Sequence, residues 1–454
     1  MRRQELSSLL IISLGFLSLL LGRSDFRPLK ATNLETIRLQ PQWQSAWIIR
    51  LSAADPEAEA IVQQYIDSLS GGGLSTSDQG VWVQTGNYPI AKHQQSRPLS
   101  AASLTKIATT LAALTTWGPD YQFETLVGSS GPLENGVLRG NLVVKGSGDP
   151  FFVWEEAISL GNALQQLGIQ QIKGNLVIIG EFAMNFETDP IKAGELLRQG
   201  LNAQLWPPEA WTQYGTLPIN TAQPKIQISG SIIVQPPETI GQVSTWLIRH
   251  QSLSLAALLK AMNIYSNNAM SEMMAAQVGG PRAVMSKAIE LADVPPSEIR
   301  LINGSGLGEE NQISPRAVVK MLVALQRSLK PHGLNVADLL PVAGQDLGTL
   351  IYRQLPTHAA LKTGSLAQVS SLAGVFPTRD RGLVWFSIIN RGGDIEGLRA
   401  KQDKLLNTLQ QHWGAASSLP TGLTPTLRLN QGPHRLGEPK RNQKFRNEGK
   451  RVEG

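Results

Sequence analysis

The chain has 454 residues, of which 41% are apolar and 17% are charged. This composition is typical of a globular protein and excludes a fibre or a disordered chain, while the length predicts two domains or one large domain with an insertion. Cysteine is absent, which excludes thiol catalysis, thiolate metal sites and disulfides. The six histidines lie far apart and none forms His-Glu-x-x-His, so a zinc peptidase is a poor interpretation and no metal or organic cofactor is expected.

The net charge of +6 is concentrated at the two ends of the chain. Residues 1–30 hold five basic and two acidic residues, and residues 415–454 hold eight basic and three acidic residues. The body between these ends is therefore slightly acidic, at −2. No basic groove is indicated across the folded part, so a nucleic-acid partner is not expected.

The N-terminus has the pattern of an export signal. Arg2 and Arg3 precede an apolar run of 13 residues, from Leu9 to Leu21, which is short for a membrane span and suits the apolar core of a signal peptide. No small-x-small cleavage site follows closely. Residues 1–30 are therefore interpreted as a signal peptide or an uncleaved anchor, and the chain is expected to be exported.

The first predicted elements are a strand-like stretch over 81–90, with a turn at Gly86-Asn87, and a helix over 103–116 with one apolar stripe. From Tyr121 to about Thr239 the pattern changes to short alternating strands with one helical segment near 155–167, which predicts an inserted, strand-rich module. Helices are expected again over 254–262, 269–278, 281–291 and 314–329, the last with Ser314 as its N-cap.

Two strands, 369–376 and 383–389, follow around a turn and are predicted to form a hairpin. A final helix is expected over 395–413. Residues 415–454 are rich in Pro, Gly, Asn and charge and have no apolar periodicity, so they are predicted to be a disordered basic tail. Our hypothesis for this tail is weak contact with anionic envelope polymers or with a membrane.

Three short patterns contain the residues that could perform chemistry. They are Ser103-Leu104-Thr105-Lys106 at the head of a helix, Ser266-Asn267-Asn268 in a loop between two helices, and Lys362-Thr363-Gly364-Ser365 entering a strand. A pattern such as Ser-x-x-Lys arises roughly once by chance in a chain of this size, so each is weak alone. Each occurs once here, and their order and context decide the interpretation.

Helix geometry places residues i and i+3 on one surface, so the Ser103 hydroxyl and the Lys106 amine can approach hydrogen-bonding distance. Lysine is a competent base only if its pKa is lowered, which burial and a nearby positive group such as Lys362 would do. A helix start also provides backbone N–H groups where an acyl oxyanion would form. The pattern thus favours Ser103 as a nucleophile with Lys106 as its base.

With these three patterns in this order, the chain resembles the penicillin-recognising serine D,D-peptidases. More closely, it resembles the D-alanyl-D-alanine carboxypeptidase/endopeptidase family, the low-molecular-mass class C penicillin-binding proteins. Further phrases that support the resemblance are Gly140-Asn-Leu-Val-Val-Lys-Gly-Ser-Gly-Asp-Pro, Tyr265-Ser-Asn-Asn-Ala-Met-Ser-Glu and Asn303-Gly-Ser-Gly-Leu. Asn303 departs from the Asp that is common in the family.

The resemblance implies an α/β (α+β) chain with a penicillin-binding transpeptidase/beta-lactamase-like fold, in which an antiparallel sheet is flanked by helices. The first two patterns lie 163 positions apart and the last two 96, so the insertion of class C proteins falls between the first two. The implied division is a split catalytic domain, residues 31–120 and 250–414, around an inserted strand-rich domain, residues 121–249.

The resemblance also implies a role for each motif residue. Ser103 would attack the carbonyl of the D-Ala-D-Ala bond, and Lys106 would take its proton. Ser266 would relay a proton to the leaving amine, while Asn268 would hold the substrate amide and orient Lys106. Lys362 with the substrate-binding residues Thr363, Gly364 and Ser365 would bind the terminal carboxylate, and the backbone N–H groups of Ser103 and Ser365 would form the oxyanion hole.

The implied partners are peptidoglycan peptides ending in D-Ala-D-Ala and beta-lactam antibiotics, and the implied location is the periplasm or the outer face of the inner membrane. Carboxypeptidase and cross-link endopeptidase activities are not separated. A beta-lactamase and a catalytically silent peptidoglycan-binding protein stay open as alternatives. The segment from Glu181 to Asn185 resembles a beta-lactamase deacylation motif, but it precedes Ser266 instead of following it and is interpreted as a coincidence.

Overall fold

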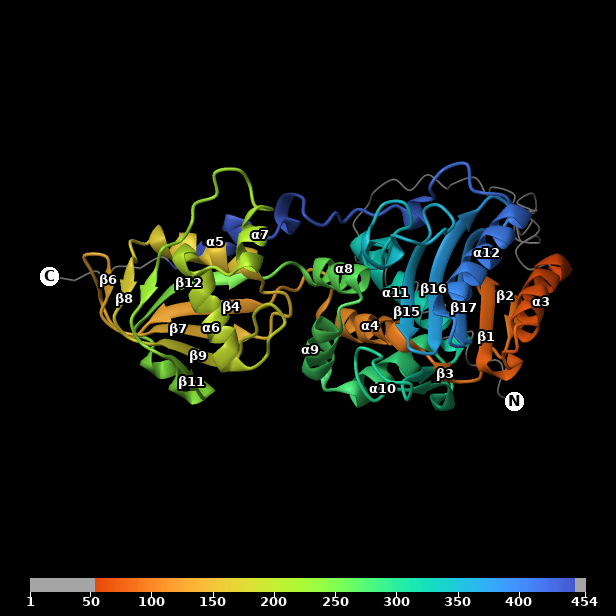
Figure 1. Ribbon diagram of the computed structural model, residues 1–454, viewed down its shortest axis with the longest axis horizontal. Helices are drawn as coiled ribbons and strands as arrows, with labels where there is room; N and C mark the ends of the chain where they lie inside the picture. The colour runs from red at the N-terminus through yellow and green to blue at the C-terminus, as the bar shows by residue number, and fades with distance from the viewer. Residues whose placement is uncertain (1–53, 446–454) are drawn as a thin grey trace, which may run out of the picture. The chain divides into compact units, whose positions relative to one another are not determined.

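The computed structural model describes residues 54–445 (Figure 1). The predicted signal peptide or anchor, residues 1–30, lies outside the described residues. Within 54–445 no helix combines the length and the apolar composition that crossing a bilayer requires. The same residues contain no group of three or more His, Asp or Glu side chains placed to hold a metal ion.

A five-stranded antiparallel sheet with the order β15-β16-β17-β1-β2 joins strands from residues 79–93 with strands from residues 360–391. Its strands are β1 Gln79–Thr85, β2 Tyr88–His93, β15 Ala360–Leu366, β16 Val369–Thr378 and β17 Gly382–Arg391. The turn predicted at Gly86 and the hairpin predicted around residues 378–382 are both confirmed. Strand β15 lies at one edge of this sheet, so one side of its backbone is not paired within the sheet.

Both faces of the five-stranded sheet are buried, because side chains alternate between its faces and each face is covered by helices (Figure 1). Trp82 and Trp385 point into a core with helices from the middle of the chain, whereas Val83 and Phe386 point into a core with the first and last helices. The helices are α3 Pro56–Ser70, α4 Thr105–Trp117, α8 Leu255–Tyr265, α9 Asn268–Val278, α10 Pro281–Ala292, α11 Pro315–Leu329 and α12 Ile395–Trp413. Ser314 caps α11 as predicted, its hydroxyl accepting from the Ala317 N–H at 3.0 Å.

The inserted module contains a six-stranded mixed sheet with the order β11-β9-β7-β4-β12-β18 and a core of its own. The strands are β4 Glu124–Ser129, β7 Leu142–Ser147, β9 Leu176–Glu181, β11 Ile232–Gln235, β12 Thr245–Gln251 and β18 Asn442–Lys444. Two smaller sheets consist of β5 Leu133–Glu134, β6 Val137–Leu138, β8 Gln171–Ile172 and β10 Gln227–Ile228, and of β3 Leu99–Ser100, β13 Ile299–Arg300 and β14 Gln312–Ile313.

The prediction of a single helix in the inserted module is wrong. Besides α5 Trp154–Gln165, the module contains α6 Pro190–Gly200 and α7 Pro208–Tyr214. Helix α6 begins with a local signal, since the Asp189 side chain accepts from the Lys192 N–H at 3.0 Å and Pro190 is at the first helical position. Its buried residues are mostly alanine and glycine, so few large apolar side chains mark the face that packs on the core.

The prediction of a disordered tail is wrong for residues 415–445. Leu423 and Leu427 are buried in the core that contains α11, and β18 pairs antiparallel with β12. The guanidinium of Arg441 is buried and bonded to the Glu156 carboxylate. This segment has no apolar periodicity because it builds no core of its own and instead adds a strand and single side chains to surfaces that other segments form.

Candidate active site

The first motif places a buried amine beside a serine hydroxyl. Ser103 lies in the 3-10 turn Ala102–Leu104, and Lys106 lies one turn later in the first turn of α4. The Lys106 Nζ donates to Ser103 Oγ at 3.0 Å, to Asn268 Oδ1 at 2.7 Å and to the Ser305 carbonyl at 2.8 Å. Lys106 is wholly buried. Burial lowers its pKa from 10.5 to about 7, against a smaller raising effect of Glu272.

The second motif lies at the junction of α8 and α9. Ser266 ends α8 in the left-handed conformation, with φ 51°, which turns the chain directly into the next helix. Asn267 then caps α9 by accepting from the Met270 N–H at 2.9 Å. Asn268, the first residue of α9, faces Lys106. The non-glycine αL residue between two helices therefore brings Ser266 and Asn268 to one site.

The third motif contributes a second buried lysine. Lys362 Nζ donates to Ser266 Oγ at 2.8 Å and to its neighbour's carbonyl, that of Thr363, at 2.7 Å. Lys362 is wholly buried, and burial together with repulsion from Lys106 holds its pKa well below the usual range. Direct contacts thus join Lys106 to Ser103 and Asn268, and Lys362 to Ser266, and the segment from Ser266 to Asn268 links the two sets.

Gly364 lets the edge strand β15 approach the backbone of Ser103. A Cβ atom at this position would lie 2.8 Å from the Ser103 backbone nitrogen, 3.1 Å from the Ala101 oxygen and 2.3 Å from Ser371 Oγ. Ser371 Oγ in turn donates to the Ala101 carbonyl at 2.8 Å, which ties β16 to the segment before Ser103. The backbone around Gly364 and Ser365 therefore lies directly beside the backbone of Ser103.

Several residues that support this site were not predicted from the sequence. The Glu272 carboxylate accepts from the N–H groups of Gly304 at 3.0 Å and Ser305 at 2.8 Å. Thr109 and Ser271 each donate to the Gly304 carbonyl at 2.7 Å. These contacts hold the Ser305 carbonyl on Lys106. The available signal was spacing, since Glu272 follows Asn268 by four residues and shares its face of α9.

Asn303, where the family commonly has Asp, closes the turn of the same loop. Its Oδ1 accepts from the Gly306 N–H at 2.8 Å and its Nδ2 donates to the Leu307 carbonyl at 2.6 Å. The Asn303 amide therefore stabilises this turn by accepting one hydrogen bond and donating another.

Ser365 is exposed, and its hydroxyl contacts a residue far along the chain. Arg399 Nη2, from α12, donates to Ser365 Oγ at 2.8 Å, and Arg399 Nη1 donates to Glu396 at 2.5 Å. No sequence pattern indicated this contact, because Arg399 belongs to none of the three motifs.

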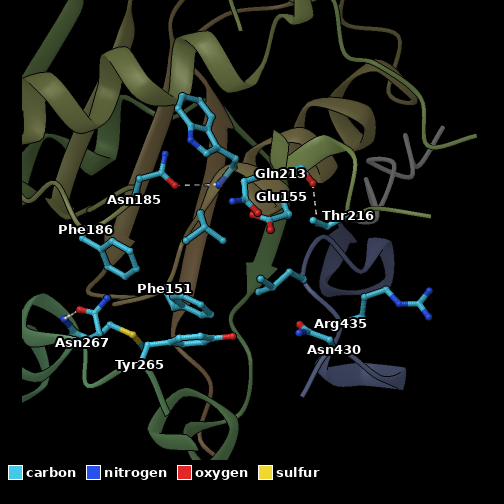
Figure 2. A pocket seen from close by; sticks show the side chains of 14 residues that line it. Phe151, Glu155, Asn185, Phe186, Gln213, Thr216, Tyr265, Asn267, Asn430 and Arg435 are labelled. Carbon is cyan, nitrogen blue, oxygen red and sulfur yellow. Dashed lines mark hydrogen bonds between the residues drawn. The ribbon is translucent and has the colours of Figure 1, made fainter. Parts of the chain in front are cut away.

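A cavity of about 580 Å³ adjoins the second motif but does not contain Ser103 (Figure 2). Tyr265, Asn267 and Met270 line it on one side, and Phe151 and Phe186 of the inserted module stack 6.0 Å apart in it. Asn430, Arg435 and Leu436 of the C-terminal segment complete the lining. A ligand in this cavity would contact Asn267 of the second motif, whereas Ser103, Lys106 and Lys362 do not line it.

Comparison with known families identifies one match that spans most of the chain. The model of the D-Ala-D-Ala carboxypeptidase 3 (S13) family matches residues 62–181 and 217–412. The D-alanyl-D-alanine carboxypeptidase DacB of Haemophilus influenzae is 24% identical over 412 residues, which cover 68% of this chain and 85% of that protein. The D-alanyl-D-alanine carboxypeptidase of an Actinomadura strain is 29% identical over 205 residues, 41% of this chain and 36% of that protein.

Solved structures with the same fold have low sequence identity to this chain. A penicillin G-acylated predatory endopeptidase from Bdellovibrio bacteriovorus aligns with a TM-score of 0.68 at 20% identity and covers 81% of this chain and 99% of its own. Penicillin binding protein 4 (DacB) from Haemophilus influenzae aligns with a TM-score of 0.58 at 19% identity and covers 77% of this chain and 99% of its own. These matches confirm the predicted fold class.

Proposed function

This chain belongs to the D-Ala-D-Ala carboxypeptidase 3 (S13) family, and from that membership we propose how its residues perform the reaction. The protein is a penicillin-binding serine peptidase that hydrolyses D-Ala-D-Ala peptides of peptidoglycan. The observation that supports Ser103 as nucleophile is the buried amine of Lys106, 3.0 Å from its hydroxyl, with a pKa of about 7. At neutral pH about half of such amines are unprotonated and able to accept a proton.

In the first step, neutral Lys106 takes the hydroxyl proton as Ser103 Oγ bonds to the carbonyl carbon of the penultimate D-Ala. The oxygen of that carbonyl becomes negative and accepts from the backbone N–H groups of Ser103 and Ser365, which the close approach at Gly364 supports. The bond to the terminal D-Ala then breaks, and its amine receives a proton through Ser266. Ser266 suits this relay because its oxygen accepts from Lys362, which leaves its own proton to donate.

The remaining motif residues bind the substrate. Asn268 Oδ1 is engaged by Lys106, so its Nδ2 is the group available to a substrate carbonyl. Thr363 and Ser365 bind the terminal carboxylate, while the edge of β15 beyond Leu361, which pairs with no other strand within residues 54–445, receives the peptide backbone. Water then hydrolyses the Ser103 ester and regenerates the hydroxyl.

The test is mass spectrometry of the purified protein after incubation with benzylpenicillin. One acyl group is expected on Ser103; Ser103→Ala should abolish it, and Ser70→Ala, a change at an exposed serine, should not. A persistent adduct in Ser103→Ala would refute the assignment, and absence of an adduct in folded wild-type protein would favour the silent peptidoglycan-binding alternative. Turnover of the adduct within seconds would favour a beta-lactamase, whereas release over minutes or longer is expected.

Incubation with defined muropeptides separates the two peptidase activities. Release of D-alanine from a monomeric pentapeptide measures carboxypeptidase activity, and conversion of a cross-linked dimer to monomers measures endopeptidase activity.

We also propose that the chain is exported to the periplasm or anchored at the outer face of the inner membrane, since its substrate belongs to the cell wall. Fusion of residues 1–30 to a reporter that is active only after export tests this. The predicted weak contact of the C-terminal segment with anionic polymers or membranes is now confined to its exposed basic residues, because Arg441 is paired internally. Loss of low-salt retention on sacculi after neutralising the exposed residues Arg428 and Lys440 is the expected result.

A further inference from the structure

The recognition of a terminal carboxylate requires a cation that faces the substrate, and Lys362 does not meet this requirement. Its side chain is wholly buried, and its amine donates to Ser266 Oγ and to the Thr363 carbonyl. Burial and the nearby Lys106 also hold its pKa well below the usual range, so it is a poor source of permanent charge. The Lys362 amine instead donates a hydrogen bond to the Ser266 hydroxyl.

Arg399, unlike Lys362, lies beside the exposed hydroxyl of Ser365. Its Nη2 atom lies 2.8 Å from Ser365 Oγ, and about a third of its side chain is exposed, at 32%. A guanidinium stays charged at every physiological pH and presents several donors in a planar fork that matches a carboxylate. It is therefore a permanent cation beside the hydroxyl that the third motif presents to the substrate.

The direction of the hydrogen bond between Arg399 and Ser365 also bears on substrate binding. Ser365 Oγ accepts from Arg399, so the hydroxyl proton points to another acceptor, and within residues 54–445 no side chain or backbone group accepts it. A carboxylate bound at Ser365 would accept this proton, and the guanidinium would strengthen the bond by polarising the hydroxyl. The same carboxylate would lie close enough to Arg399 to be attracted directly.

We propose that Arg399 is the residue that selects substrates with a free terminal carboxylate, acting on it together with the Ser365 hydroxyl. This inference rests on the proposed peptidase function and adds a specificity residue to it. Arg399 joins the site only in the folded protein, since 34 positions separate it from Ser365.

Glu396 limits the effect of this charge. Glu396 lies three residues before Arg399 on α12, and its carboxylate accepts from Arg399 Nη1 at 2.5 Å. The Glu396 side chain is 79% exposed. The pair holds the guanidinium in one orientation, while the carboxylate offsets part of the attraction for a substrate anion. Removal of the Glu396 charge should consequently favour acidic substrates, which a merely structural role of the pair does not predict.

The experiment compares an acyl-D-Ala-D-Ala peptide with a free carboxylate to the same peptide ending in a carboxamide. Arg399→Gln should lower kcat/KM for the acid by about tenfold and leave that for the amide within a factor of two. Arg399→Lys should restore part of the loss, and Glu396→Gln should raise kcat/KM for the acid about twofold without changing the amide. Arg379→Gln, which removes an exposed arginine beside Asp380 at the opposite end of β16, is the matched control and should change neither.

Equal losses on acid and amide in Arg399→Gln, or no loss on either, would overturn the inference. Formation of the penicillin adduct at Ser103 is measured in each variant. A wild-type protein that forms no adduct and cleaves neither peptide contradicts the proposed function itself, and the role of Arg399 falls with it. An active wild-type protein whose acid-to-amide ratio is unchanged by Arg399→Gln contradicts the role of Arg399 alone.

Discussion

Replacement of Gly364 by alanine tests whether the approach of β15 to Ser103 builds the oxyanion site. The new Cβ would lie 2.8 Å from the Ser103 nitrogen and 2.3 Å from Ser371 Oγ, where ordinary contacts begin at 3.4 Å. The backbone at position 364 must therefore retreat from the nitrogen by about 0.6 Å and from the hydroxyl by about 1.1 Å unless these groups give way. A displacement of about 1 Å between reacting groups costs on the order of 100-fold in rate.

We expect Gly364→Ala to lower the rate constant of penicillin acylation and kcat/KM for D-alanine release by about 100-fold. Overpacking should also lower the free energy of unfolding by about 1 to 3 kcal/mol, measured by denaturant titration. Gly393→Ala is the control, because a Cβ atom there meets nothing within 4 Å. Retention of more than a third of the acylation rate in a folded Gly364→Ala protein would refute the argument that this contact aligns the oxyanion donors.

Three further predictions follow from the buried charges. The penicillin acylation rate should fall about tenfold per pH unit below pH 7 and level off above it, because Lys106 must lose its proton and its pKa is about 7; a rate independent of pH between 5 and 8 would contradict Lys106 as the base. Lys362→Ala should lower D-alanine release by orders of magnitude through loss of its bond to the serine of the second motif, and a loss below threefold in steady-state kinetics would remove Lys362 from the mechanism. Arg441→Ala should destabilise the protein by about 3 to 5 kcal/mol, since it leaves the buried Glu156 carboxylate without its cation, whereas Arg428→Ala, a change at an exposed residue, should have little effect. Thermal and denaturant unfolding measure the stability of both variants. If Arg441→Ala were as stable as Arg428→Ala, the C-terminal segment would not be part of the folded unit.

Local patterns were sufficient wherever the structure depends on near neighbours in the chain. The pairing of Ser103 with Lys106 follows from helical spacing, and the cap at Ser314 and the final helix, Ile395–Trp413, follow from short-range signals. The helices of the inserted module were harder to predict, because α6 and α7 are short and the buried residues of α6 are mostly alanine and glycine instead of large apolar side chains. The fold of residues 415–445 was missed for a related reason, since its strand and its buried Arg441 need surfaces built elsewhere.

The order of the three motifs can be read directly from the sequence, and the assignment of nucleophile and base and the position of the insertion were predicted from residue identity and from spacing along the chain. The direction in which each cation points depends on the tertiary structure. Lys362, expected at the substrate carboxylate, is turned toward Ser266, and Arg399 lies beside Ser365 from a different helix. The direction of a side chain is set by burial and by partners that lie tens or hundreds of positions away, and no local pattern contains that information.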